Sequence, residues 1–227
     1  MRVLAIDTAL EACAVAVLDT AQGVLASESR PMERGHAEAL MPLVAHVMSL
    51  ARTQFPEIDR IAVTTGPGSF TGLRVGISAA RGISLASGQP AYGVTTLAAF
   101  AAPHIAQDDA IPVTAVIDAR HEHVYLQIYG PGGRTLVAPR IATIRDAVRL
   151  AANGPARIVG SAANMLAAAW PSREPGPKLV EQHPAPDVNW VARLAAAVSG
   201  NPPGPPKPLY LRAPDAQPQD AARLPRR

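Results

Sequence analysis

A glycine-rich turn decides how this chain folds, and it reads Gly66-Pro67-Gly68-Ser69-Phe70-Thr71-Gly72-Leu73-Arg74-Val75-Gly76. It follows the apolar, strand-like residues 61–64 and opens a helix-like segment. Such a turn directs backbone N–H groups and a helix N-terminus at one place, which suits an anion or a closely docked partner. The turn lacks the Lys and Ser/Thr of a P-loop, and Thr71 replaces the third glycine of the dinucleotide fingerprint. A purely structural turn, in which glycine supplies the backbone angles, is at least as good an interpretation.

The pattern around this turn occurs twice along the chain. Strand, strand, strand, helix, strand and helix are predicted at 2–7, 12–18, 23–28, 35–52, 58–65 and 71–88, and again at 111–118, 122–129, 134–138, 143–153, 156–160 and 161–169. A short strand at 92–94, a helix near 95–102 and a last helix near 188–199 complete the prediction. The first strand of each half ends in an aspartate, Asp7 or Asp118. This repetition predicts an α/β fold with two similar lobes and a cleft between the ends of their first strands.

The expected division of the chain is a first lobe at 1–103, a second lobe at 104–212 and a tail at 213–227. Residues 202–208 contain five prolines and predict an extended spacer, and residues 209–212 are a short apolar anchor after it. The tail is rich in Pro, Ala and Arg and is expected to be disordered.

Composition favours a cytoplasmic protein without a membrane span. Hydrophobic residues make up 48% of the 227 residues, but no apolar run approaches the ~20 residues that a spanning helix needs. The acidic Asp7 comes too early for a signal peptide, and the single cysteine, Cys13, allows no internal disulfide. The net charge is +3, and three arginines in the tail, Arg223, Arg226 and Arg227, are a weak indication of RNA contact.

Two helices are candidates for a partner interface, since apolar and small residues recur along them at helical spacing. The predicted interface residues are His36, Leu40, Met41, Val44, Met48, Leu73, Gly76, Ile77, Ala80 and Ile83. Small side chains such as Gly76 let a partner helix approach closely, as in a four-helix bundle. The alternative is that both helices only cover their own sheet.

Candidate residues for a nucleotide or anion site are Asp7, Gly66, Gly68, Ser69, Arg74 and Asp118. Paired carboxylates at strand ends can hold a Mg²⁺–phosphate group, although each could equally cap a turn. His121 and His123 alternate along a predicted strand, and two histidines without a third ligand do not make a metal site. We therefore assign no metal and no catalytic residue.

The glycine turn closely resembles the signature of the TsaB (YeaZ) family, whose members take part in tRNA threonylcarbamoyladenosine biosynthesis. The likeness extends from residue 1 to about Arg212. It includes Leu4-Ala5-Ile6-Asp7-Thr8, His36-Ala37-Glu38-Ala39-Leu40-Met41-Pro42, Asp118-Ala119-Arg120 and Pro208-Leu209-Tyr210-Leu211-Arg212. The family has the actin/Hsp70/sugar-kinase (ribonuclease H-like) fold, which agrees with the duplicated βββαβα lobes.

The resemblance implies a non-catalytic subunit that binds and stimulates TsaD, the paralogue that transfers threonylcarbamoyl to N6 of adenosine 37 in tRNAs reading ANN codons. It implies TsaE as a third component, TsaC as the source of the threonylcarbamoyl adduct, tRNA contact through the complex, and often a homodimer when the chain is alone. No cofactor is expected on this chain alone, and ATP or ADP at the subunit junction stays open. TsaD holds its metal with an H-x-x-x-H motif, and Thr96 and Phe100 stand at the matching positions here.

A different function remains open from the residues themselves. The chain could be an active ATPase or phosphotransferase of the same superfamily that uses Asp7 and Asp118. A standalone RNA-binding protein is the third hypothesis, supported only by the arginine-containing tail.

Overall fold

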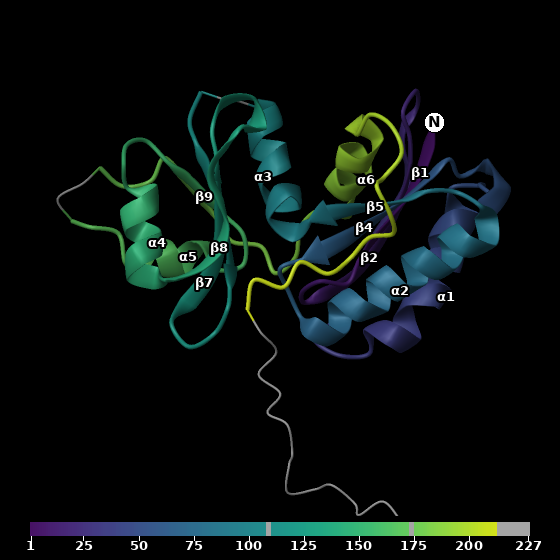
Figure 1. Cartoon of the computed structure of the whole chain (residues 1–227), viewed down its shortest axis with the longest axis horizontal. Coiled ribbons are helices and arrows are strands. Elements are labelled where there is room, and N and C mark those ends of the chain that lie inside the picture. The colour runs from purple at the N-terminus through teal and green to yellow at the C-terminus, as the bar shows by residue number, and fades with distance from the viewer. Residues whose placement is uncertain (108–109, 173–174, 213–227) are drawn as a thin grey trace, which may run out of the picture.

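Two five-stranded mixed sheets of the same topology form the protein, as a computed structural model shows for residues 1–107, 110–172 and 175–212 (Figure 1). The first sheet has the order β3-β2-β1-β4-β5, and the second has the matching order β8-β7-β6-β9-β10. In each sheet the first three strands are antiparallel, and the fourth and fifth strands run parallel to the first. The duplication predicted from the sequence is confirmed.

The first sheet contains β1 (Arg2–Asp7), β2 (Ala12–Asp19), β3 (Gly23–Pro31), β4 (Arg60–Gly66) and β5 (Ala91–Thr95). Its outer face is covered by α1 (His36–Leu50) and α2 (Phe70–Ser87). A short 3-10 turn, η1 (Phe55–Glu57), precedes β4. β1 and β2 are buried along nearly their whole length because helices cover both faces of the sheet, which explains their continuous apolar sequence.

The second sheet contains β6 (Val113–Asp118), β7 (His123–Tyr129), β8 (Thr135–Thr143), β9 (Arg157–Val159) and β10 (Leu179–Glu181). Its outer helices are α4 (Ile144–Ala151) and α5 (Ala163–Ala168), and η2 (Pro131–Gly133) joins β7 to β8. The sequence did not reveal β10, since three half-buried residues give no periodic signal. The repeating unit is therefore longer than predicted by one strand and one helix.

Two helices lie between the sheets, and each packs on the sheet of the other half of the chain. α3 (Thr96–Gln107) follows the first sheet but packs on the second, where Leu97, Phe100 and Ala101 contact β6 and β7. α6 (Val188–Ala197) follows the second sheet but packs on β1 and β2 of the first. Residue 103, the expected lobe boundary, lies within α3, so the division at 103 stays a prediction. The expected tail at 213–227 lies outside the described residues.

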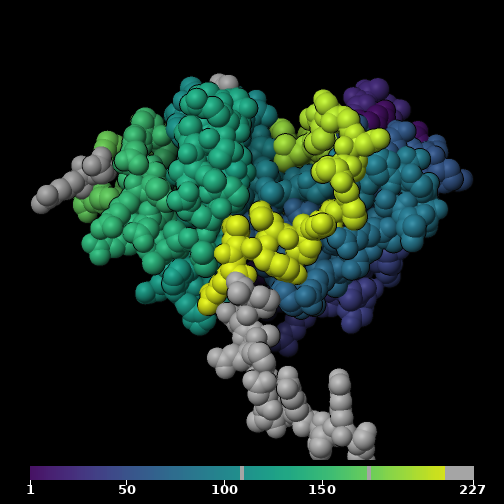
Figure 2. Space-filling view, in the orientation of Figure 1, coloured from purple at the N-terminus to yellow at the C-terminus, as the bar shows by residue number. Residues whose placement is uncertain are grey.

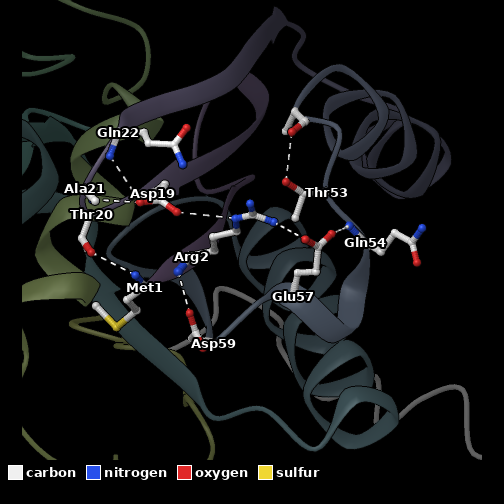
Figure 3. A network of polar contacts seen from close by, with 11 residues as sticks. Met1, Arg2, Asp19, Thr20, Ala21, Gln22, Thr53, Gln54, Glu57 and Asp59 are labelled. Atoms are coloured by element: carbon white, nitrogen blue, oxygen red, sulfur yellow. Dashed lines mark hydrogen bonds and ion pairs between the residues drawn. The ribbon is translucent and has the colours of Figure 1, made fainter.

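A network of polar contacts fixes the start of β1 (Figure 3). The Arg2 guanidinium pairs with Glu57 at 2.5 Å and with Asp19 at 3.5 Å, and the Arg2 backbone N–H donates to Asp59 at 2.7 Å. Backbone N–H groups at Ala21 and Gln54 and the Arg2 cation hold the pKa values of Asp19 and Glu57 below their usual range. These contacts tie β1 to its two neighbours, and so they set the register that places Asp7 at the opposite end.

Among the described residues, none of the helices combines the length and the apolar character that a membrane span requires.

Candidate functional site at the glycine turn and the first-lobe helices

The glycine turn packs directly against the connection between β1 and β2. A Cβ atom on Gly68 would collide with the carbonyl oxygen of Ala9, and one on Gly72 would collide with that of Thr8. The Ser69 backbone N–H donates to Ala9 O at 2.7 Å, and Thr8 Oγ1 donates to Gly72 O at 2.7 Å. Only glycine allows these two backbones to approach so closely.

Two backbone donors of the turn, the N–H groups of Ser69 and Gly72, are used inside the chain. Ser69 is the N-cap of α2, and its Oγ accepts from the Gly72 N–H at 3.3 Å. Gly66 has φ +106°, and the position of its missing Cβ lies 3.2 Å from Leu209 O. These contacts favour the structural interpretation of the turn, and an anion site at Gly66, Gly68, Ser69 and Arg74 stays a prediction.

Asp7 and Asp118, which the duplication relates, have opposite environments. Asp7 is fully buried, and its Oδ1 accepts from Thr64 Oγ1 at 2.5 Å and from the Ala9 N–H at 3.0 Å. Burial raises the pKa of Asp7, against the opposing effect of these hydrogen bonds. Asp118 is exposed, and its Oδ1 accepts from the Arg120 N–H at 2.7 Å. Each carboxylate therefore bonds the N–H two residues on, as a turn-capping aspartate does.

Asp7 is consequently a poor ligand for a cation, because it presents no surface to solvent. The described residues contain no group of three or more His, Cys, Asp or Glu side chains able to hold a metal ion. His123 begins β7, but His121 lies in the preceding turn with φ +51°, so the prediction that both share one strand face was wrong. Thr96 and Phe100 are buried in the first turns of α3.

Most of the residues predicted to form the partner interface do not lie on the outward faces of α1 and α2. Of the ten predicted interface residues, only Met41 is exposed, at 48%. The nine others, His36, Leu40, Val44, Met48, Leu73, Gly76, Ile77, Ala80 and Ile83, are buried against the first sheet. These nine residues fit the alternative, in which the helices cover their own sheet. A Cβ on Gly76 would lie 2.5 Å from Thr8 Oγ1, so Gly76 serves packing within the chain.

A different set of residues faces solvent on these two helices. It includes small or apolar residues, Ala37, Met41, Ala45, Ser78, Gly82 and Leu85, which we call the outer face, and also the polar side chains of Glu38, His46, Arg74 and Arg81. Leu85 is 89% exposed, and nothing lies within 4 Å of the Cβ position of Gly82. α1 and α2 lie side by side and contact each other (Figure 1), so the outer face spans both. The sequence could not reveal this face because small and apolar residues occur on both sides of α2.

The last described residues, 199–212, form a strap across the molecule, seen in yellow in Figure 2. Arg81 donates twice to Pro206 O, at 2.9 and 2.6 Å, and the Leu209 N–H donates to Thr65 O at 2.8 Å. Arg212 Nη1 then reaches Ala119 O of the second lobe at 3.4 Å. Residues 202–208 have no regular secondary structure, and the chain bends at 203–205.

Sequence reasoning also missed a polar cluster between the lobes. His104 Nε2 lies 3.7 Å from Glu181 Oε2, and His183 Nε2 lies 3.4 Å from the same oxygen. These side chains line a cavity of about 450 Å³ between β3, α3 and β10. Burial lowers the pKa of His104 despite the neighbouring carboxylate. His104, Glu181 and His183 lie far from the glycine turn in the sequence and share no motif with it.

The two lobes of the same topology, with inner helices exchanged between their sheets, define the class of the protein as a duplicated α/β fold. EutJ from Carboxydothermus hydrogenoformans shares this fold with a TM-score of 0.51 at 12% identity, over 84% of this chain and 88% of that one. YeaZ from Pseudomonas aeruginosa matches with a TM-score of 0.74 at 27% identity, over 92% of this chain and 99% of that one.

Sequence comparison agrees with the structural match. The family model for tRNA N6-adenosine threonylcarbamoyltransferase matches residues 23–178. The chain is 39% identical to the tRNA threonylcarbamoyladenosine biosynthesis protein TsaB of Escherichia coli, over 57% of this chain and 55% of that protein, so the alignment spans about half of either length. It is 37% identical to an uncharacterized protein of Mycobacterium tuberculosis over 95% of this chain and 94% of that protein. The chain belongs to the TsaB/YeaZ family.

A matched pair of glycines in α2 tests the orientation of the helix. Gly76→Ala should lower the free energy of unfolding by about 1–3 kcal/mol, because the new methyl group meets Thr8 Oγ1 in a filled space. Gly82→Ala should raise it by about 1 kcal/mol, because alanine has the higher helix propensity and the space is open. Urea unfolding of the two variants measures both effects. Equal effects at the two positions would contradict the described orientation of α2.

The protonation of Asp7 has a measurable consequence. Above about pH 3.8 the unfolded chain loses the Asp7 proton while the native chain keeps it up to its raised pKa, so the stability of the native protein falls as the pH rises through that window. Asp7→Asn has no such proton, so its stability relative to the native sequence should increase over the same range. Urea unfolding at several values from about pH 4 to pH 8 checks this. A relative stability that is constant, or that falls, would show that Asp7 is ionised in the fold.

Proposed function

We propose that this chain is a non-catalytic subunit of the complex that transfers threonylcarbamoyl to N6 of adenosine 37 in tRNAs reading ANN codons. Its role is to bind and stimulate TsaD, within a cytoplasmic complex that also contains TsaE and uses the adduct made by TsaC. The supporting observation is membership of the TsaB/YeaZ family together with an unburied outer face on α1 and α2. No cofactor is proposed for the chain alone, and a nucleotide at the junction with TsaD stays a prediction.

The outer face has the chemistry of a helix-packing surface. Leu85 projects almost fully into solvent, so nearly all of its apolar surface is available for burial against a partner. Beside it, a groove of about 450 Å³ lies between the last turns of α2 and the strap, lined by Ser84, Pro90, Ala91, Pro202 and Pro205 among others. Gly82 leaves room for a partner helix to approach α2. The partner is therefore expected to meet this face, and not the buried residues first predicted.

The environment of Asp7 supports an accessory role over catalysis. An ATPase or phosphotransferase that uses Asp7 and Asp118 needs both carboxylates within reach of a Mg²⁺–phosphate group. Asp7 is fully buried and bonded to Thr64 and Ala9. The test is hydrolysis of Mg-ATP by the isolated chain. Hydrolysis that is lost when Asp118→Ala is introduced would favour an enzyme over an accessory subunit.

Co-purification with TsaD of the same organism tests the proposal. Leu85→Asp should weaken the complex at least tenfold, because it replaces an apolar contact worth about 1.5–3 kcal/mol with a buried charge. Its thermal midpoint should stay unchanged, since Leu85 contributes little to the chain's own core. Affinity is measured by calorimetry, and the tRNA modification is measured by mass spectrometry in a depleted strain.

Leu136→Asp is the matched control, because Leu136 is an exposed leucine on β8 of the second lobe, at 45%. It should bind TsaD as the native chain does. Failure of the native chain to bind TsaD, or to restore the modification, would exclude the proposed function. Native binding with no effect of Leu85→Asp would exclude the outer face as the interface.

A further inference from the structure

An exposed aromatic pair lies where the strap crosses the first turn of α2. Phe70 is the first residue of α2, and its ring centroid lies 5.3 Å from that of Tyr210 on the strap, with the planes tilted by 31°. The Arg74 guanidinium lies 3.7 Å from the centre of the Phe70 ring, and its Nε donates to the Tyr210 hydroxyl at 3.3 Å. Phe70 is 37% exposed and Tyr210 is 42% exposed. We call these three residues the platform.

Cationic side chains continue from the platform along the strap. Lys207 is exposed, Arg212 bonds Ala119 O, and Arg120 is exposed in the turn that follows β6. The Asp118 carboxylate in this turn accepts from the Arg120 backbone N–H at 2.7 Å. The platform is thus flanked by positive charge that reaches from the first lobe to the second.

Stacked rings next to cations are the features with which proteins bind single-stranded RNA. Unpaired bases stack on aromatic rings and on arginine planes, and Arg and Lys side chains neutralise the phosphates between them. We propose that the platform, with Lys207, Arg212 and Arg120, contacts the RNA substrate directly and stacks an unpaired base of an RNA loop. The choice of RNA as the ligand rests on the proposed function, whereas the stacking chemistry rests on the platform itself.

The platform lies at the end of α2 opposite to Leu85, the most exposed residue of the outer face. Phe70 and Leu85 lie at opposite ends of α2, 15 residues apart, or about 22 Å along the helix axis. A base stacked at Phe70 and a partner side chain packed on Leu85 would therefore contact opposite ends of α2. Variants at the two ends can be tested independently of each other.

Binding of an unmodified tRNA transcript that reads an ANN codon tests the proposal, with fluorescence anisotropy on the full chain and on its complex with TsaD. Tyr210→Leu and Phe70→Leu should each weaken RNA binding about 5- to 100-fold, the range expected for loss of one stacked base. Tyr210→Phe removes the bond to Arg74 but keeps the ring, so its affinity should stay within about twofold of the native value. A blunt RNA duplex of equal length should show no effect of the ring variants, because its bases are not free to stack.

The salt dependence of RNA affinity distinguishes the contribution of base stacking from that of the cationic side chains. Lys207→Gln and Arg120→Gln should each lower the slope of log K against log salt by about 0.7, whereas Tyr210→Leu should leave the slope unchanged. Arg145→Ala, which removes an exposed cation from α4 of the second lobe, is the control for net charge and should not change RNA affinity beyond about twofold.

The competing outcome is that the platform only fastens the strap to α2. In that case Tyr210→Leu and Phe70→Leu would lower the thermal midpoint but leave tRNA affinity equal to that of Arg145→Ala, and the proposal would be wrong. Absence of tRNA binding by both the native chain and the complex would also overturn it. Co-purification with TsaD, measured on the same variants, shows whether the proposed function still holds in either case.

Discussion

The contact between the glycine turn and the end of β1 determines how the first lobe is built. Because Gly68 and Gly72 have no side chains, the start of α2 rests directly on the carbonyl groups of Ala9 and Thr8. The hydrogen bonds between Ser69 and Ala9 and between Thr8 and Gly72 then fix the direction in which α2 leaves the sheet. Since this contact closes the end of β1, Asp7 is sealed inside it and its pKa rises.

The second lobe repeats the topology without repeating this closure. In this lobe a comparable close approach occurs at Gly160, where a Cβ would meet the carbonyl oxygen of Val116. The helix α5, which follows, has six residues. The turn after β6 stays open, with positive φ at Arg120, His121 and Glu122. Asp118 therefore remains exposed while Asp7 is buried. The two aspartates, alike in sequence position, cannot act as a symmetrical pair.

The sequence predicted the duplicated strands and helices because long apolar runs and helical periodicity are local signals. It failed where the outcome depends on a neighbour that the pattern does not specify. Gly76 and Gly82 look equivalent in a helix rich in small residues, yet one faces Thr8 and the other faces open space. The exchange of α3 and α6 between the sheets is equally invisible, since each helix is apolar enough to pack on either sheet. β10 was missed because it has only three residues.

Three sides of α2 pack against other parts of the chain, and the fourth side remains open to a partner. Leu73, Ile77 and Ala80 face the sheet, and Val75 and Ala79 pack into the cluster that α1 completes. Arg74 and Arg81 turn toward the strap, where they bond Tyr210 and Pro206. These three directions occupy most of the circumference of the helix, which repeats every 3.6 residues. Ser78, Gly82 and Leu85 lie on the remaining side, and Leu85 is left 89% exposed by the part of the chain that the structure describes. A surface left open by the packing of all the other sides is where a second protein can bind without rearranging the fold.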